Sequence, residues 1–151
     1  MSLGRYKKFV PVVLSVASMS KDRSTKVGAI ALGPDLEIRS VGYNGFPRGV
    51  NDDDDARHER PTKLFLTAHA ESNAVAQAAR SGVSLAGCTV MVSSLYPCST
   101  CAKMLIQAGV TRVLAVGVNH ESMSRWAEEW SYSKVMFEEA GVEFCELKEQ
   151  G

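Results

Sequence analysis

The stretch CTVMVSSLYPCSTCAKMLIQAGVTRVLAVGV, residues 88–118, decides the fold of this chain. Its apolar run at 88–93 predicts a strand, the segment at 98–108 predicts a helix, and the apolar run at 112–118 predicts a second strand. Two strands joined through a helix pair in parallel by a right-handed crossover. The stretch therefore predicts an α/β protein.

The same alternation of elements extends in both directions from this unit. Toward the C-terminus the pattern predicts a helix at 122–140 and a strand at 142–147. Toward the N-terminus it predicts a helix at 5–20, a hairpin of strands at 27–32 and 37–43, and a helix from Thr67 or Ala68 to about Ser81, where Gly82 stops it. These elements predict one domain over residues 1–151, with a three-layer α/β/α arrangement and a mixed five-stranded sheet. The segment at 46–67 is long for a loop in a compact domain, which indicates a functional loop.

The composition limits the classes of function. The chain has 17 Lys or Arg and 17 Asp or Glu, so it lacks the net positive charge with which proteins bind long nucleic acids. No apolar run approaches the roughly 20 residues of a membrane span, and the N-terminus lacks the residue series of a secretion signal. We therefore expect a cytoplasmic protein that acts on a small molecule, with neither long nucleic acid nor membrane as a partner.

Four residues in two short motifs carry the chemistry. His69, Cys98 and Cys101 offer one imidazole and two thiolates, a three-ligand set that leaves the fourth position of tetrahedral Zn²⁺ open for water. Bound Zn²⁺ lowers the pKa of its water from about 15.7 to about 7, which supplies a nucleophile at neutral pH. Glu71, two residues beyond His69, is placed to move protons rather than to bind the metal. Together the residues match the H-x-E…P-C-x-x-C signature of zinc deaminases and predict hydrolytic deamination.

Other interpretations of these residues are weaker. A Cys-x-x-C pair also occurs in redox proteins and structural zinc sites, but a redox motif leaves His69 and Glu71 unexplained. A histidine by itself is more often a hydrogen-bonded core residue, yet the order and spacing of all four residues argue against that here. A non-catalytic zinc module has little need for a free carboxylate beside an open metal position, so Glu71 favours an enzyme.

Four segments together resemble deoxycytidylate deaminases of the cytidine deaminase superfamily. They are Val27-Gly28, Gly42-Tyr43-Asn44-Gly45-Phe46-Pro47-Arg48-Gly49, His69-Ala70-Glu71-Ser72-Asn73-Ala74 and Pro97-Cys98-Ser99-Thr100-Cys101-Ala102. The resemblance runs from about residue 22 to about residue 118, and Ser72 departs from a common pattern. It implies the cytidine-deaminase-like fold, a zinc cofactor, and conversion of deoxycytidine monophosphate (dCMP) to dUMP and ammonia, which supplies thymidylate synthesis. Deamination of 5-methyl-dCMP, dCTP, cytidine, cytosine or guanine is the alternative; balanced charge argues against adenosine in tRNA.

The resemblance also implies which residues contact the base and sugar. Asn44 would hydrogen-bond the deoxyribose or the base. A structural turn at Asn44-Gly45 is the alternative, because both residues tolerate positive φ. Ala70 and Tyr96 would line the apolar slot that a flat pyrimidine needs.

A nucleotide substrate also needs cationic groups for its phosphate. Arg23, Lys26 and Arg48 are the candidates, because a guanidinium offers paired donors to phosphate oxygens and an ammonium offers a point charge. The resemblance further implies activation by dCTP and inhibition by dTTP, an effect associated with the Gly-Tyr-Asn-Gly segment. Tyr43 and Arg48 are therefore candidates for effector binding, and a triphosphate effector could bring Mg²⁺ with it.

The last predicted helix is rich in large apolar residues, a class enriched at protein interfaces. They are Trp126, Trp130, Tyr132, Val135, Met136 and Phe137. Core packing explains part of this pattern. The resemblance implies a homo-oligomer, with a homohexamer favoured over the dimers and tetramers that occur elsewhere in the superfamily.

Overall fold

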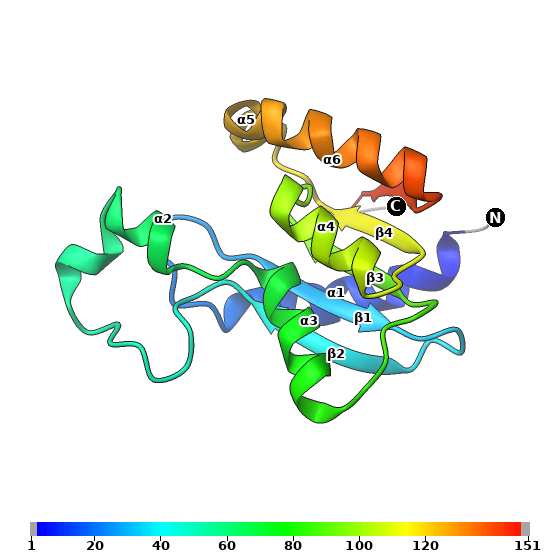
Figure 1. Ribbon diagram of the computed structural model, residues 1–151, viewed down its shortest axis with the longest axis horizontal. Helices are drawn as coiled ribbons and strands as arrows, with labels where there is room; N and C mark the ends of the chain where they lie inside the picture. The colour runs from blue at the N-terminus through cyan, green and yellow to red at the C-terminus, as the bar shows by residue number, and fades with distance from the viewer. Residues whose placement is uncertain (1–2, 149–151) are drawn as a thin grey trace.

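The computed structural model describes residues 3–148, and a five-stranded sheet lies at their centre (Figure 1). Its strands are β1 (Gly28–Leu32), β2 (Ile38–Tyr43), β3 (Thr89–Ser93), β4 (Arg112–Val116) and β5 (Glu143–Leu147). They lie in the order β2-β1-β3-β4-β5. β1 is antiparallel to β2 and β3, whereas β3, β4 and β5 are parallel. The mixed five-stranded sheet predicted from the sequence is confirmed.

Helices cover both faces of this sheet. α1 (Val10–Ser18), preceded by the 3₁₀ helix η1 (Gly4–Phe9), packs on one face. α3 (Ala70–Ser81), α4 (Ser99–Gln107) and α6 (Ala127–Ala140) pack on the other. In Figure 1, α1 lies behind the sheet, and α3 and α4 lie in front of it. The three-layer α/β/α arrangement is therefore confirmed.

Successive side chains along the strands point to opposite faces of the sheet and so divide the core into two layers. Ile30 and Met91 pack with Val13 of α1, and all three are fully buried. Their strand neighbours Ala31 and Val92 belong to the layer beneath α3 and α4. Successive strand side chains point to opposite faces, so a strand covered on both sides is buried along its whole length, as β1 and β3 are.

Three predicted helices differ from the structure. The helix predicted to begin at Thr67 or Ala68 begins at Ala70, because Thr67 caps the end of α2 and His69 takes the N-cap position. The helix predicted at 5–20 begins as η1, and its α-helical part starts at Val10, because Pro11 suits only the first turn of an α-helix. The helix predicted at 122–140 is divided into α5 (His120–Met123), the 3₁₀ helix η3 (Ser124–Trp126) and α6. Helical structure begins early here because the Asn119 side chain caps α5, accepting the Ser122 backbone N–H at 3.1 Å. No helix within residues 3–148 has the length and apolar character of a membrane span.

The predicted loop at 46–67 contains the 3₁₀ helix η2 (Asp55–His58) and the short helix α2 (Thr62–Leu66). We call residues 46–66 the arm; it projects from one side of the sheet, at the left of Figure 1. Ion pairs join it to the segment before β1: Arg23 with Asp55 at 2.8 Å and Lys63 with Asp22 at 3.0 Å. These contacts link residues far apart in the sequence, so local periodicity could not predict them.

Gly42 allows α3 to lie directly against β2. A Cβ at this position would collide with the backbone of Ala70 and Ala74, and backbone atoms cannot move aside as a flexible side chain can. Glycine is the residue that permits such close backbone approach. The start of α3 is therefore held at the end of β2, which places the residues of the first turn of α3.

Candidate active site

Two helix starts meet at one edge of the sheet. His69 occupies the N-cap position of α3 with an extended backbone, and Cys98 occupies the N-cap position of α4. The Cys98 Sγ accepts the Cys101 backbone N–H at 3.5 Å, so the chain turns tightly between the two cysteines. Because α4 follows β3, Cys98 lies beyond the C-terminal end of a strand, where sites of open α/β sheets are found.

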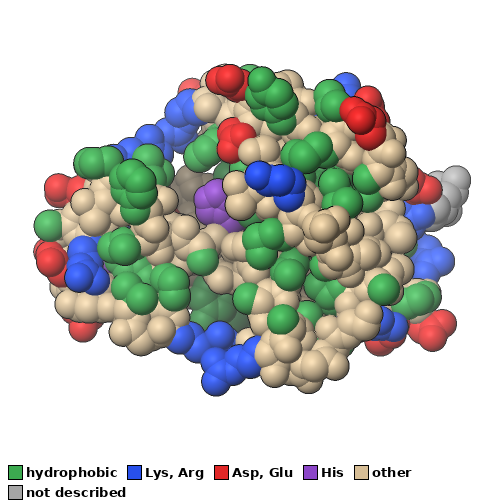
Figure 2. All heavy atoms as spheres, in the orientation of Figure 1, with side chains coloured by type: hydrophobic (Ala, Val, Ile, Leu, Met, Phe, Trp, Pro, Cys, Tyr) green, Lys and Arg blue, Asp and Glu red, His purple; other side chains and the backbone are tan. Residues whose placement is uncertain are grey.

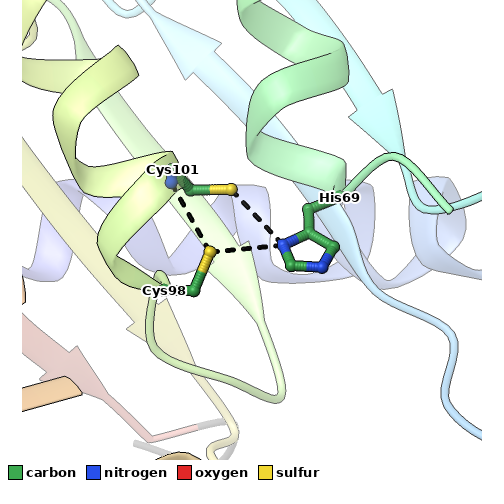
Figure 3. A group of neighbouring side chains, drawn as sticks. All are labelled: His69, Cys98 and Cys101. Carbon is green, nitrogen blue, oxygen red and sulfur yellow. Dashed lines mark hydrogen bonds between the residues drawn. The ribbon is translucent and has the colours of Figure 1, made fainter. Parts of the chain in front are cut away.

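The side chains of His69, Cys98 and Cys101 converge (Figure 3). His69 Nδ1 lies 3.4 Å from Cys98 Sγ and 3.5 Å from Cys101 Sγ. The three potential ligand atoms all lie within 4.8 Å of one another. A tetrahedral Zn²⁺ about 2.3 Å from sulfur and about 2.0 Å from nitrogen separates its N and S ligands by about 3.5 Å. The donor set and its spacing therefore both fit zinc.

The electrostatics of the three side chains also suit a cation. The pKa of the Cys98 thiol is lowered to about 4, chiefly because its thiolate accepts a hydrogen bond from Cys101, with His69 as a further partner. The same hydrogen bond, together with burial, raises the pKa of Cys101. The hydrogen bond to Cys98 raises the pKa of His69. Negative charge is therefore concentrated at Cys98, where a metal ion would compete with the shared protons.

Glu71 lies in the first turn of α3 and is almost fully buried, with 5% of its surface exposed. Burial raises the pKa of its carboxyl to about 7, against the opposing effect of His69. A carboxyl with a pKa near neutrality can both accept and return a proton at physiological pH. The structure thus brings Glu71 close to the three converging side chains of His69, Cys98 and Cys101, which we call the metal-ligand group, in a state suited to proton transfer.

A cavity opens from this group to the surface. Figure 2 shows it as a hollow in which a histidine side chain is visible. The cavity measures about 120 Å³, several times the roughly 10–15 Å³ that one water molecule needs, so it has room for a small ring. His69, Glu71 and Cys98 line it, and the predicted Ala70 and Tyr96 also belong to its wall.

Tyr96 contributes its ring to the wall while its hydroxyl is already bonded. The hydroxyl donates to Glu146 on β5 at 2.8 Å, and burial together with this bond raises the pKa of Tyr96 to about 12. The ring packs against Trp130 at a centroid distance of 4.5 Å and against Phe144 at 5.1 Å. Tyr96 therefore offers an apolar surface rather than a free polar group.

Asn44 is buried in the cavity wall and holds the ends of two strands together. Its Oδ1 accepts the Val27 N–H at 2.8 Å, and its Nδ2 donates to the Thr25 carbonyl at 2.9 Å. An amide nitrogen has two N–H groups, so one remains for another partner. Neither Asn44 nor Gly45 has a positive φ, so the alternative of a left-handed turn at this pair is wrong.

The structure does not bring the cationic residues predicted from the sequence to the cavity. Arg23 is paired with Asp55, and Lys26 lies outside the lining. Arg48 donates to the Gln77 Oε1 at 2.9 Å, also outside it. Tyr43 is exposed and lines a second hollow beside Asn44, which Arg48 does not reach. The binding roles of these four residues stay predictions.

Residues that the sequence did not single out for the site also line the cavity. Arg60 and Lys63 come from the arm, Arg125 from η3 and Glu129 from α6. The length of segment 46–67 was the one sequence signal that pointed to the arm. Trp126 and Trp130, predicted for an interface, line the cavity as well, and Phe137 is buried in the core.

One family model and several known proteins are similar to this chain. Residues 4–117 match the model of the cytidine and deoxycytidylate deaminase zinc-binding region. A protein of Aliivibrio fischeri, an uncharacterized deaminase in the luxG 3′ region, is 42% identical over 137 residues, covering 91% of this chain and 89% of its own. The Homo sapiens deoxycytidylate deaminase is 33% identical over 141 residues, covering 90% of this chain and 75% of its own.

Solved structures share the fold. The dCMP deaminase from the cyanophage S-TIM5, in complex with dCMP and dUMP, matches with a TM-score of 0.75 over 97% of this chain and 99% of that one. The sequence identity is 24%, so the match shows the fold rather than the ligand.

Proposed function

The chain belongs to the cytidine and deoxycytidylate deaminase family of hydrolytic deaminases, and from this premise we propose that its substrate is dCMP. The products are dUMP, a precursor for thymidylate synthesis, and ammonia. One observation carries the proposal: His69, Cys98 and Cys101 converge beside the buried carboxyl of Glu71 at the inner end of a cavity. The deoxycytidylate deaminases among the relatives favour a deoxynucleotide as the occupant of that cavity.

In this proposal His69, Cys98 and Cys101 hold Zn²⁺. The ion, when bound, supplies Lewis-acid activation of water. Glu71 takes a proton from the water that attacks C4 and delivers it to the ring nitrogen N3. It then carries the proton of the new C4 hydroxyl group to the exocyclic amino group. The bond between C4 and that amino nitrogen breaks, ammonia leaves, and C4 becomes a carbonyl carbon. Its pKa of about 7 allows transfer in both directions.

The wall of the cavity orients the base. Ala70, fully buried at the start of α3, and the ring of Tyr96 provide apolar surfaces for a flat pyrimidine. The second N–H of the Asn44 amide has no hydrogen-bond partner within residues 3–148 and donates to the base or to the deoxyribose. The two hydrogen bonds from Asn44 to the β1 segment fix the direction of that donor.

Regulation by dCTP and dTTP is part of the same proposal, with Mg²⁺ accompanying the triphosphate. Its structural support is the second hollow, where Tyr43 lies beside Lys21 and His58. This hollow shares Asn44 and Asp22 with the wall of the cavity, so a ligand there would adjoin the substrate. We expect dCTP to raise and dTTP to lower the rate at subsaturating dCMP. A rate that responds to neither triphosphate across a substrate titration would reject regulation.

A homohexamer is the proposed assembly. Tyr132 and Val135 on α6 are 60% and 50% exposed, and Ile38 on the edge strand β2 is 47% exposed. Apolar side chains that form a contiguous exposed patch mark interaction surfaces, and Tyr132 and Val135, three residues apart on α6, are neighbours on one helix face. Sedimentation of the purified protein should give the mass of six chains, and a monomer at micromolar concentration would contradict the proposal. The single-domain organisation and cytoplasmic location stay predictions from the sequence.

The substrate is tested by ammonia release from the zinc-loaded protein. The panel contains dCMP, 5-methyl-dCMP, dCTP, CMP, deoxycytidine, cytosine and guanine. The proposal predicts the highest kcat/KM for dCMP. A preference for an unphosphorylated base or nucleoside would keep the deamination chemistry but reject the nucleotide. The uncharacterized Aliivibrio fischeri deaminase, at 42% identity, is a natural comparison enzyme for the same panel.

A further inference from the structure

Three cationic side chains line the cavity, and one of them is already neutralised. Lys63 Nζ lies 3.0 Å from Asp22 Oδ1 and 3.2 Å from Ser24 Oγ. Only 12% of the Lys63 side chain and 9% of the Asp22 side chain is exposed. A pair so well shielded has little net charge to offer a ligand, so Lys63 and Asp22 act as part of the wall.

The other two cations, Arg60 and Arg125, are exposed and have no partner in the described part of the chain. Neither guanidinium has a hydrogen bond or ion pair with any residue in the described range 3–148. Arg80 at the end of α3 shares this property but lies outside the cavity. The remaining described arginines are all held by partners: Arg5, Arg23, Arg39, Arg48, Arg57 and Arg112. Free guanidinium groups at a cavity are therefore specific to Arg60 and Arg125.

The two arginines approach the cavity from different segments. Arg60 lies in the arm just before α2, and Arg125 lies in η3 just after α5. Figure 2 shows Lys and Arg side chains gathered on the rim of the hollow, between the positions that α2 and α5 occupy in Figure 1. His69 and Cys98 of the metal-ligand group line the same hollow. A ligand with its reacting ring at that group and an anionic end at the rim would lie along the cavity.

The acidic residues of the wall do not cancel this charge. Asp22 is paired with Lys63, and Glu71 is buried at the inner end. Glu129 accepts the Ser99 hydroxyl at 2.6 Å and forms no ion pair with Arg125, although the two are four residues apart. Among the described residues, Glu129 is therefore the one acidic residue of the wall that is neither paired with a cation nor fully buried, and the two guanidinium groups outnumber it.

We propose that Arg60 and Arg125 form a two-sided clamp for the 5′-phosphate of the nucleotide. The inference rests on the proposed function and deepens it, because it names the residues that distinguish a nucleotide from a nucleoside. A guanidinium presents paired donors that match two phosphate oxygens, and charge-assisted hydrogen bonds of this kind are the stronger ones. The clamp replaces Arg23 and Lys26, which lie outside the cavity, as the phosphate-binding group.

The test compares the variants Arg60→Gln, Arg125→Gln and the double variant with a matched control, Arg80→Gln. Glutamine keeps a similar length and removes the charge. Each single variant should lower kcat/KM for dCMP by about 10-fold to 100-fold, because a hydrogen bond to a charged group contributes about 1.5–3 kcal/mol. The rate with deoxycytidine, which lacks the phosphate, should stay within about two-fold of wild type. Arg80→Gln should match wild type on both substrates.

Equal losses of kcat/KM for dCMP and deoxycytidine, or no loss for either substrate, would overturn the clamp.

Calorimetric binding of dUMP and of deoxyuridine separates a failure of the clamp from a failure of the proposed function. Wild-type protein that binds dUMP but does not deaminate dCMP would reject the proposed function; loss of dUMP binding in the double variant would still support the clamp. Unchanged dUMP affinity in the double variant would reject the clamp whatever the activity. Melting temperatures of all variants should agree, because both side chains are exposed.

Discussion

Asp22 and Lys63 form a shielded ion pair at 3.0 Å that joins the segment before β1 to the arm. The Asp22 carboxylate also accepts the backbone N–H groups of Ser24 at 2.8 Å and of Thr25 at 3.0 Å. Both Asp22 and Lys63 line the cavity. One carboxylate thus organises the loop that enters β1 and holds the base of α2 against it.

This ion pair predicts a pH dependence of stability. Burial alone would raise the pKa of the Asp22 carboxyl, but the hydrogen bonds from Thr25 and Ser24 and the nearby Lys63 hold it below its ordinary value. A lowered folded-state pKa means that the carboxylate stabilises the fold above its unfolded pKa of about 3.9, and that this stabilisation is lost as the pH falls through the folded pKa. Asp22→Asn should therefore lower the free energy of unfolding by about 1.5–3 kcal/mol at pH 7.

The measurement is urea denaturation of wild type and Asp22→Asn from pH 7 down to about pH 3. The difference between the two proteins should shrink on acidification, because wild-type Asp22 becomes neutral as well. Any common loss of zinc at low pH cancels in this difference. A difference that stays constant over the whole range would show that the charge of Asp22 does not stabilise the fold.

The close contact between Gly42 and α3 predicts that one added methyl group at position 42 lowers the free energy of unfolding. In Gly42→Ala the new Cβ meets the Ala70 and Ala74 backbone, so α3 must move away from β2. We expect a loss of about 1–3 kcal/mol in the free energy of unfolding. Activity should fall too, because α3 carries Glu71. The control is Gly45→Ala, where a Cβ meets nothing within 4 Å and φ is not positive, so its stability should stay within about 0.5 kcal/mol.

Substitution of Asn44 should affect two quantities that can be measured separately, the stability of the fold and KM for dCMP. Asn44→Ala removes the acceptor of the buried Val27 N–H and the donor to the Thr25 carbonyl, which should cost about 1–3 kcal/mol of stability. If the remaining N–H also contacts the ligand, KM for dCMP should rise at temperatures where the variant is fully folded. Thermal melting and steady-state kinetics on one preparation distinguish the two. An unchanged KM in folded Asn44→Ala would leave Asn44 with a structural role alone.

Metal removal should abolish activity reversibly. His69, Cys98 and Cys101 fit Zn²⁺, so dialysis against a chelator should yield an inactive apoprotein of lower melting temperature. Zinc at about 100 times its Kd should restore about 2.7 kcal/mol of stability together with the activity. Full activity after complete removal of zinc, verified by elemental analysis, would contradict the assignment of these ligands.

Local sequence patterns predicted the elements that carry the metal-ligand group. The Cys98–Cys101 motif marks the start of α4 because an N-cap thiolate satisfies backbone N–H groups, and Gly82 stops α3 in the left-handed conformation that glycine favours. The parallel pairing of β3, β4 and β5 followed from the helices between them, and the antiparallel pairing of β1 with β2 followed from the hairpin pattern. These features depend on neighbours within a few residues, so the sequence displays them directly.

The arm and the rim of the cavity could not be predicted in this way. Asp55 lies in an acidic run that resembles a solvated loop, yet in the fold it pairs with Arg23 and removes that arginine from the set of free cations. Arg125 follows α5, where an unbroken helix was expected, and so reaches the cavity. Which arginine is paired and which is free depends on contacts between distant segments. A single sequence shows the charges but not these partners.

Proton transfer by Glu71, beside a metal held by His69, Cys98 and Cys101, is tested by the Glu71→Gln variant. The variant is assayed for zinc content and for dCMP deamination on the same sample. We expect one zinc ion per chain, as in wild type, and a loss of about 10²-fold to 10⁴-fold in kcat, because the amide has nearly the same shape but cannot carry a proton. Deamination within about ten-fold of wild type, with zinc still bound, would contradict proton transfer by Glu71.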